Sequence, residues 1–268
     1  KATDTAKSPA SSVSFQNKKM LVVEDNLVNQ KVVKTLLTKM GLEVDTANDG
    51  FEGVDALQKG RYAAVLMDCQ MPGLDGFDAT REIRNWEQQH ERSRTPVIAV
   101  TANAMEGDRE RCLESGMDDY LAKPIKRAEL ARLLEKWIRA ETHDTGDTLM
   151  PEQNAADDHS PVNQAVLDEL KEIMEEDFAD LVSTYLDDAP QRLREVRDAI
   201  RDKDVDALRA SAHTLKSSSA NLGALHLSAL AKELELLARG GSTRGGSSLF
   251  NQALEELKRV KKVLQPMC

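Results

Sequence analysis

The spacing of apolar residues changes part-way along this sequence, and this change constrains the fold more than any other feature. From Lys18 to about Ala140, short apolar runs alternate with amphipathic stretches that resemble helices and often end in glycine, a frequent helix stop. The runs that we expect to form strands are MLVVED, EVDTAND, AAVLMD, PVIAVTA and DYLAKP. Five strand–helix alternations predict an α/β domain over residues 18–140, a doubly wound five-stranded parallel sheet with helices on both faces.

Beyond residue 162 the apolar positions follow the helical period alone. Three stripes at this spacing begin at Phe178, Leu227 and Phe250, and short loops separate them. Pro190 interrupts the first stripe, so we expect a kink there or a division into two helices. The pattern predicts an all-α domain, a four-helix bundle over residues 163–268.

Two stretches lack any hydrophobic period. Residues 1–17 are rich in Ser, Thr, Ala and Lys, and residues 141–162 are polar and contain two prolines. We interpret the first as a linker and the second as a flexible linker between the two domains. Because the sequence begins with Lys1 and a linker, we expect it to be part of a longer protein.

The composition excludes several classes of partner. The net charge is −10 and the sequence pI about 5.1, which argues against a nucleic-acid-binding surface. No apolar run approaches the ~18 residues that a membrane span needs, so we expect no membrane contact by these residues. Three cysteines without metal-ligand spacing indicate a reducing compartment, and we expect a cytoplasmic location.

Chemically active side chains follow several of the expected strands. Glu24 and Asp25 come after MLVV, Asp68 after AAVLM, Thr101 ends the fourth strand and Lys123 the fifth. Such residues also begin ordinary loops, but the ends of parallel strands meet at one sheet edge, where ligands bind. Three clustered carboxylates repel one another and raise one another's pKa. A hard cation such as Mg²⁺ would relieve that repulsion, so we expect a magnesium site.

These motifs resemble a known domain. VVEDN, LMDCQMPGLDG, VTA and DYLAKPI, in that order and spacing, are similar to the receiver domain of response regulators and hybrid histidine kinases. The resemblance implies that Asp68 accepts a phosphoryl group. It also implies that Glu24, Asp25, Asp68 and the backbone carbonyl of Gln70 hold Mg²⁺.

The same resemblance assigns roles to the later strands. It implies that Thr101 and Lys123 contact the phosphoryl oxygens, and that Thr101 and Tyr120 form the switch that responds to phosphorylation. The bond that corresponds to Lys123–Pro124 is often cis in members of this family. The physical roles agree with phosphoryl transfer, in which positioning and charge stabilisation supply most of the catalysis.

Two other classes of protein remain as alternatives for the first domain. A metal-dependent hydrolase of the same form would also use Asp68 as a nucleophile, but such enzymes usually carry a second acid where this chain has Gln70. A receiver-type interaction module without phosphotransfer would not need the complete set of acids, Thr101 and Lys123.

The stretch AHTLKSSSANLGA places a histidine among small residues in a helical region. At about 100° per residue, His213 lies about 160° from Leu215 and about 180° from Leu222, so we expect it to point away from the bundle core and into solvent. Lys216 is one turn away and can pair with an anion on the imidazole, while Ser217 leaves room for another protein. A surface histidine without function is the alternative. An exposed imidazole is a nucleophile that can receive and return phosphate.

This stretch, on a predicted bundle, resembles the histidine-containing phosphotransfer (HPt) domain. Ser217 replaces the glycine that often follows the lysine in that family. Many relatives carry a glutamine on the neighbouring helix to contact the phosphate, but SALAKELELLAR contains none. The sequence therefore does not identify this second polar partner.

Together the two resemblances imply the C-terminal part of a bacterial hybrid sensor histidine kinase that acts in a two-component phosphorelay. Asp68 would take phosphate from the histidine of an upstream kinase domain and pass it through His213 to the aspartate of a downstream response regulator. The stretch EDNLVNQ is more similar to receivers of hybrid kinases than to those of DNA-binding regulators. No ATP-binding kinase motif is present, so these residues should act as a phosphotransfer module; the parent chain would be anchored in the inner membrane. A receiver-type regulatory module without relay to His213 is the alternative.

Overall fold

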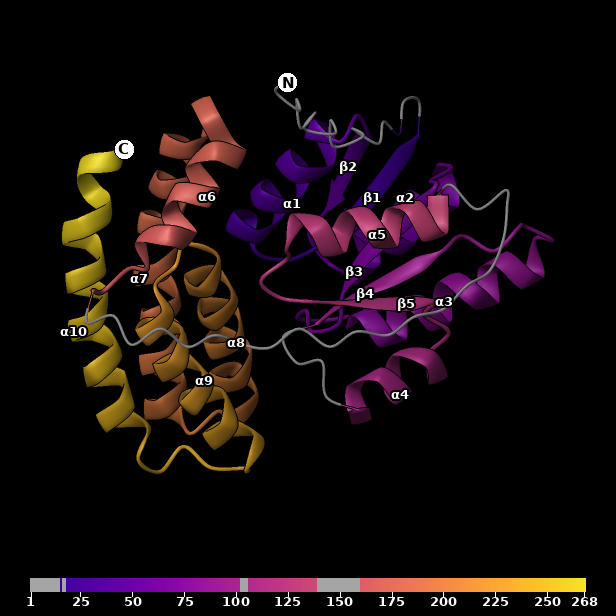
Figure 1. Cartoon of the computed structure of the whole chain (residues 1–268). Helices are drawn as coiled ribbons and strands as arrows, with labels where there is room; N and C mark the ends of the chain where they lie inside the picture. Colours follow the sequence, from indigo (N-terminus) through magenta and orange to yellow (C-terminus); the bar gives the residue numbers. More distant parts are fainter. Residues whose placement is uncertain (1–14, 16–17, 102–105, 139–159) are drawn as a thin grey trace, which may run out of the picture.

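The computed structural model describes residue 15 and residues 18–101, 106–138 and 160–268. Its first half is a five-stranded parallel sheet in the order β2-β1-β3-β4-β5, which confirms the predicted α/β fold (Figure 1). The strands are β1 (Lys19–Val23), β2 (Glu43–Ala47), β3 (Ala64–Asp68), β4 (Val97–Thr101) and β5 (Asp119–Ala122). The helices are α1 (Leu27–Lys39), α2 (Gly50–Lys59), α3 (Gly76–Gln89), α4 (Glu106–Glu114) and α5 (Arg127–Ile138).

Helices cover both faces of this sheet because its strands are apolar on both sides. Side chains of α1 and α5 pack with alternate strand residues such as Met20, Val22 and Leu66. Side chains of α2, α3 and α4 pack with the intervening residues, such as Leu21 and Met67. The functional side chains gather at the carboxyl edge of β1, β3, β4 and β5.

The second half is helical and confirms the predicted bundle. Its long helices are α7 (Phe178–Asp202), α8 (Val205–Asn221), α9 (Leu225–Arg239) and α10 (Gly246–Leu264), and the shorter α6 (Gln164–Met174) lies at one end (Figure 1). The 3-10 turns η1 (Glu175–Asp177) and η2 (Gln265–Met267) complete it. Pro190 lies inside α7, which continues through it. Of the two predicted outcomes, the division into two helices is therefore wrong, and the kink stays a prediction.

The predicted linkers fall almost entirely outside the described residues. Phe15, near the end of the first, is buried, and its backbone N–H donates to Met40. Val162, at the end of the second linker, is also buried. Phe15 and Val162 belong to the apolar cluster that includes side chains of α1, α5 and much of the bundle. In the part of the chain that the structure describes, no helix is both long enough and apolar enough to cross a membrane.

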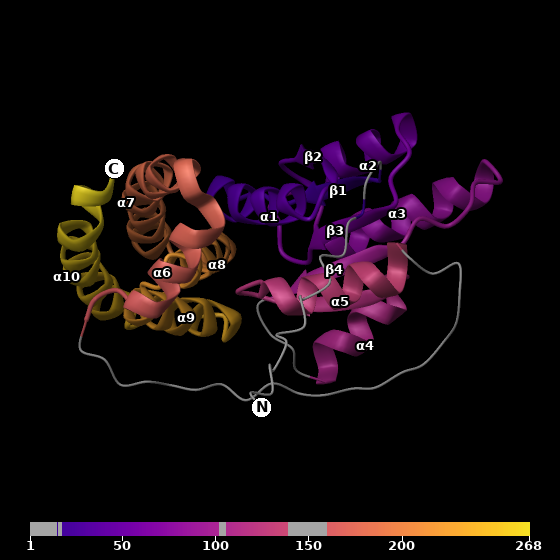
Figure 2. The same cartoon turned by 45° about the horizontal axis from the view of Figure 1, so that its top comes forward.

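The first domain contacts the bundle mainly through one helix. In both views α1 lies beside the bundle, and it contacts α6, α7 and α8 (Figure 2). Since α1 begins immediately after the acids at the end of β1, this contact places the bundle next to the carboxyl edge of the sheet.

Candidate functional site

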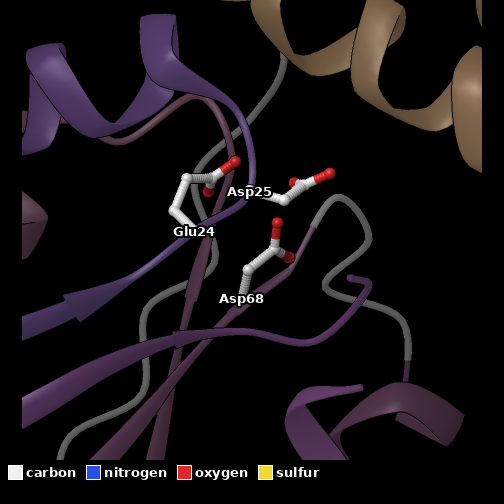
Figure 3. Close-up of side chains that lie close together, drawn as sticks. All are labelled: Glu24, Asp25 and Asp68. Atoms are coloured by element: carbon white, nitrogen blue, oxygen red, sulfur yellow. The ribbon is translucent and has the colours of Figure 1, made fainter. Parts of the chain in front are cut away.

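Three carboxylates converge at the carboxyl edge of the sheet, as predicted. Glu24 and Asp25 follow β1 and Asp68 is the last residue of β3, and one carboxylate oxygen from each lies within 4.8 Å of the others (Figure 3). Glu24 and Asp68 are buried, and Asp25 is partly exposed. Parallel strands produce this cluster directly, because β1 and β3 are neighbours and end at the same edge.

Lys123 lies against two of these acids. Its Nζ donates to Glu24 Oε2 at 2.7 Å and to Asp68 Oδ2 at 2.6 Å. Burial disfavours the charged ammonium, but the carboxylates of Asp68 and Glu24 outweigh it and raise the pKa of Lys123 above its ordinary value. The lysine therefore stays cationic and offers a fixed positive charge beside Asp68.

One lysine does not balance three acids. The pKa of Glu24 is raised to about 8: burial is the largest cause, Lys123 acts to lower the pKa, and the charges of Asp68 and Asp25 add to the rise. Burial and the charge of Asp68 likewise raise the pKa of Asp25 to about 6, against Lys123 and Arg192. Burial is the main cause of both shifts, and the neighbouring carboxylates add to it.

The remaining residues predicted for this site lie around it. Thr101 ends β4 at the same edge, and its carbonyl accepts from the Lys123 N–H at 2.7 Å. The Gln70 N–H donates to Asp68 Oδ1 at 3.1 Å. Tyr120 is half-buried on β5. The Lys123–Pro124 bond is cis, as expected. The switch role of Thr101 and Tyr120 and the metal-ligand role of Gln70 stay predictions.

His213 lies in the middle of α8 and is only 4% exposed, so the prediction that it is exposed to solvent is wrong. Its Nδ1 lies 3.2 Å from Glu235 Oε1, on α9. A carboxylate can only accept, so Nδ1 carries the proton and donates it to Glu235. The other ring nitrogen, Nε2, is consequently the one with the lone pair.

Glu235 is a polar partner of the His213 ring that the sequence does not predict. Its carboxylate also accepts from the Lys216 ammonium, and from Arg239 at 2.7 Å. Burial alone would raise the pKa of Glu235, but the hydrogen bond with His213 and the Lys216 charge lower it below its usual range. Glu235 does not take the role of the phosphate-contacting glutamine of that family, because a carboxylate accepts hydrogen bonds and cannot donate to a phosphoryl oxygen. The α8–α9 packing that brings Glu235 to His213 has no local sequence signal.

The imidazole is neutral and its Nε2 has no hydrogen-bond partner among the described residues, although this atom is buried. The pKa of His213 is lowered, mainly by burial, and the positive charges of Lys216 and Lys123 also act to lower it. The hydrogen bond with Glu235 and the charge of Asp68 act in the opposite direction. Two of these groups, Asp68 and Lys123, belong to the other domain. The acid cluster and the histidine are therefore close enough to influence each other electrostatically.

Polar contacts join the two sites. Asp25 Oδ2 accepts from the Thr214 hydroxyl at 3.5 Å. Asn29 Nδ2 donates to Glu24 Oε1 at 2.7 Å and to the Ser217 hydroxyl at 3.1 Å. The small side chain at position 217 lets α1 approach α8 closely, which is the room that the sequence analysis expected beside His213.

This geometry defines a class of protein. A doubly wound sheet that presents a buried aspartate beside a lysine and two further acids has the parts of a phosphoryl acceptor. A helical bundle that presents a buried histidine, with Nε2 free of hydrogen bonds to the described residues and within electrostatic range of that aspartate, has the parts of a second acceptor. The two together form a phosphotransfer pair.

Comparisons with known protein families agree with this class. Residues 20–135 match the model of the response regulator receiver domain, and residues 180–263 match that of the Hpt domain. The chain belongs to the two-component signalling family in which a receiver domain is joined to an Hpt domain, and its role is in phosphorelay signalling.

Its relatives include much longer sensor kinases. The sensor protein GacS of Pseudomonas syringae pv. syringae is 35% identical over 259 residues, which cover 94% of this chain and 28% of that protein. Hybrid signal transduction histidine kinase I of Dictyostelium discoideum is 46% identical over 125 residues, which cover 45% of this chain and 7% of that protein. The chain thus spans little more than a quarter of the first relative and a smaller part of the second.

Solved structures resemble part of the chain. The receiver domain of sensor histidine kinase PA1611 from Pseudomonas aeruginosa PAO1, described with a magnesium ion in its active site cleft, is 52% identical and covers 46% of this chain and 98% of its own, with a TM-score of 0.42. A chain from the complex of the phosphotransfer protein Ypd1 with the receiver domain of Ssk1, from Saccharomyces cerevisiae, is 31% identical. The match covers 46% of this chain and 90% of that chain, with a TM-score of 0.45.

Proposed function

We propose that Asp68 accepts a phosphoryl group from the histidine of an upstream kinase domain and that His213 receives it from Asp68. His213 then gives it to the aspartate of a separate response regulator. The observation that carries this proposal is the unpartnered Nε2 of a neutral, buried His213 within electrostatic range of Asp68 and Lys123. The kinase domain would belong to the same longer protein or to a partner chain in the cytoplasm, where ATP is available.

We propose that Glu24, Asp25 and Asp68 hold Mg²⁺. The residues fit this ion: their oxygens cluster within 4.8 Å, they are hard ligands, and the charge of each acid contributes to the raised pKa of its neighbour. Bound Mg²⁺ would neutralise the acids and the phosphoryl oxygens. Both oxygens of Glu24 have protein partners, Asn29 and Lys123, and both oxygens of Asp68 have partners as well, Gln70 and Lys123. Asp25, whose Oδ2 accepts from Thr214 at 3.5 Å, is the least engaged of the three ligands.

The chain's own residues supply the rest of the chemistry at Asp68. Phosphorylation places new negative charge at the end of β3, where Lys123 Nζ is already 2.6 Å from Asp68 Oδ2. The ammonium can move from the carboxylate to a phosphoryl oxygen with little displacement. Thr101 lies at the same edge and would donate its hydroxyl to another of these oxygens.

Transfer to the bundle is a displacement at phosphorus. The Nε2 lone pair of His213 forms the new N–P bond, the bond from phosphorus to the Asp68 oxygen breaks, and Asp68 leaves as a carboxylate. Nδ1 keeps its proton, so the ring gains positive charge. Glu235 accepts the Nδ1 hydrogen bond and balances that charge. Lys216 Nζ lies 3.4 Å from Nδ1 and pairs with Glu235, so its pairing with the transferred phosphoryl group stays a prediction.

The substitution Asp25→Asn tests the acid cluster. Without Mg²⁺ we expect it to stabilise the folded chain by about 2 kcal/mol at pH 8, because each pKa unit corresponds to about 1.4 kcal/mol. A carboxyl group whose pKa is raised on folding stabilises the folded chain at pH values below the pKa of the unfolded chain, near pH 4. This stabilisation is lost as the pH rises toward the folded-state pKa, which is about 6 for Asp25 and about 8 for Glu24. Denaturant unfolding at pH 5 and pH 8 measures it.

The same variant should lose most of its Mg²⁺ affinity by calorimetry. It should also gain little phosphoryl adduct, by intact mass, when incubated with acetyl phosphate and Mg²⁺, whereas the wild type gains one. Asp55→Asn, on the exposed surface of α2, is the matched control and should change none of these quantities. Unchanged Mg²⁺ affinity in Asp25→Asn would contradict the proposed site.

A further inference from the structure

The side-chain amide of Asn29 joins the acid cluster to the bundle. Its Nδ2 donates to Glu24 Oε1 at 2.7 Å and to the Ser217 hydroxyl at 3.1 Å, and its Oδ1 accepts from Asn221 Nδ2 at 2.7 Å. A carboxylate can only accept, so the contact with Glu24 determines which end of the amide faces the acid cluster. The amide therefore contacts the receiver through its nitrogen and the bundle through both its nitrogen and its oxygen.

A helix cap and burial hold Asn29 in this place. Asn29 lies in the first turn of α1, and its backbone N–H donates to Oδ1 of the N-cap residue Asn26 at 3.0 Å. Asn29 is only 1% exposed, so an amide that lost its protein partners would have no bulk water to replace them. The bundle contacts therefore fix the orientation of an amide that also holds an acid of the cluster.

Glu24 extends this contact to the phosphoryl acceptor. Its other oxygen, Oε2, accepts from Lys123 Nζ at 2.7 Å, and the same Nζ donates to Asp68 Oδ2 at 2.6 Å. The result is a continuous series of hydrogen bonds from α8 to the end of β3, through Asn221, Asn29, Glu24, Lys123 and Asp68. Each carboxylate oxygen has a second lone pair, so Glu24 can bind Mg²⁺ while it accepts from Asn29 and Lys123.

We propose that Asn29 is a positioning residue through which the docked bundle strengthens Mg²⁺ binding at the acid cluster. This inference rests on the proposed magnesium site. While Ser217 and Asn221 hold the amide, Asn29 keeps the Glu24 carboxylate in the orientation that serves both Lys123 and the cation. Coupling between two binding equilibria is reciprocal, so bound Mg²⁺ strengthens the docking of the bundle by the same factor.

A double-mutant cycle between the two asparagines measures this coupling. Calorimetry gives the Mg²⁺ dissociation constant of the full chain as wild type, Asn221→Ala, Asn29→Ala and the double variant, without a phosphoryl donor. We expect Asn221→Ala to weaken Mg²⁺ binding by about threefold and Asn29→Ala by about tenfold, within the range of one hydrogen bond. In the Asn29→Ala chain, Asn221→Ala should have no further effect, because the residue that links Asn221 to Glu24 is gone.

Lys31→Ala is the matched control for a general loss of docking. Lys31 also lies on α1, and its Nζ donates to Asp180 Oδ2 at 2.5 Å and to the Thr184 hydroxyl at 2.7 Å, contacts with the bundle that involve neither Asn29 nor Glu24. Because exposed ion pairs contribute little to docking, this variant should leave the Mg²⁺ dissociation constant unchanged. If Lys31→Ala weakens Mg²⁺ binding as much as Asn221→Ala does, or if the two asparagine substitutions are additive, the role of Asn29 is wrong.

The inference and the magnesium site fail in different ways. If Asp25→Asn binds Mg²⁺ weakly but Asn221→Ala binds it as tightly as wild type, the coupling through Asn29 is wrong and the site stands. If Asp25→Asn binds Mg²⁺ as tightly as wild type, the site itself is wrong and the coupling with it. Denaturant unfolding checks that each variant is folded. Should the buried Asn29→Ala variant not fold, the comparison of Asn221→Ala, at a partly exposed position, with Lys31→Ala decides the outcome.

Discussion

Asp68→Ala is expected to remove both kinds of phosphoryl label from the chain when it is incubated with labelled acetyl phosphate and Mg²⁺. The acyl phosphate on Asp68 is cleaved readily by alkali, whereas the phosphoramidate on His213 is cleaved by acid and survives alkali. Because His213 is covered by the receiver and 4% exposed, it should be charged through Asp68 rather than by the reagent directly. Splitting each sample between acid and alkali measures the two labels separately.

His213→Gln is the complementary variant. It should keep the alkali-labile label on Asp68 and lose the alkali-stable one, because no other histidine among the described residues lies beside the acid cluster. Denaturant unfolding confirms that each variant is folded. Alkali-stable label that persists after Asp68→Ala would show that the order of transfer is wrong, and label that persists after His213→Gln would show that another histidine is the acceptor.

Glu235→Ala should slow transfer from Asp68 to His213 by about 100-fold. The carboxylate holds the imidazole by Nδ1 and keeps the lone pair on Nε2, and a misplaced reacting group can cost a factor of this size. The variant also leaves the buried Lys216 without its acid, so positive charge would lie beside a ring that must itself become positive. Single-turnover decay of the acyl phosphate measures the rate.

Glu235→Gln distinguishes positioning from simple loss of packing. Its amide oxygen can still accept from Nδ1–H, so we expect it to recover most of the rate, within about tenfold of wild type, since the lost charge weakens the hydrogen bond. Imidazole nitrogen NMR should show the Nδ1–H tautomer in wild type and in Glu235→Gln, and a mixture in Glu235→Ala. Equal rates in the alanine and glutamine variants, both folded, would contradict a positioning role for Glu235.

The sheet and its active edge were predictable from sequence because their causes are local. Each expected strand is a short apolar run. Parallel pairing places the carboxyl ends of these strands at one edge of the sheet, and this does not depend on how the helices pack. Glu24, Asp25, Asp68, Thr101 and Lys123 therefore lie where the pattern places them. The spacing of apolar residues in the second half likewise predicts the bundle, although α7 continues through Pro190.

What the sequence did not predict depends on packing between distant segments. A helical wheel shows that His213 faces away from the apolar stripe, but it does not show that another domain covers that face. Glu235 is 22 residues from His213 and lies on a different helix, so no local spacing connects them. The role of Asn29 is similar, since its partners Ser217 and Asn221 lie 188 and 192 residues further along.

The relay from Asp68 to His213 within one chain is the central claim, and time-resolved labelling of the wild type tests it most directly. The chain is charged briefly with labelled acetyl phosphate and Mg²⁺, the reagent is removed, and acid-labile and alkali-labile label are followed at several protein concentrations. The account predicts that alkali-labile label falls as alkali-stable label on His213 rises, with one rate constant that does not depend on concentration. Loss of the alkali-labile label to free phosphate, with no label on His213, would contradict it.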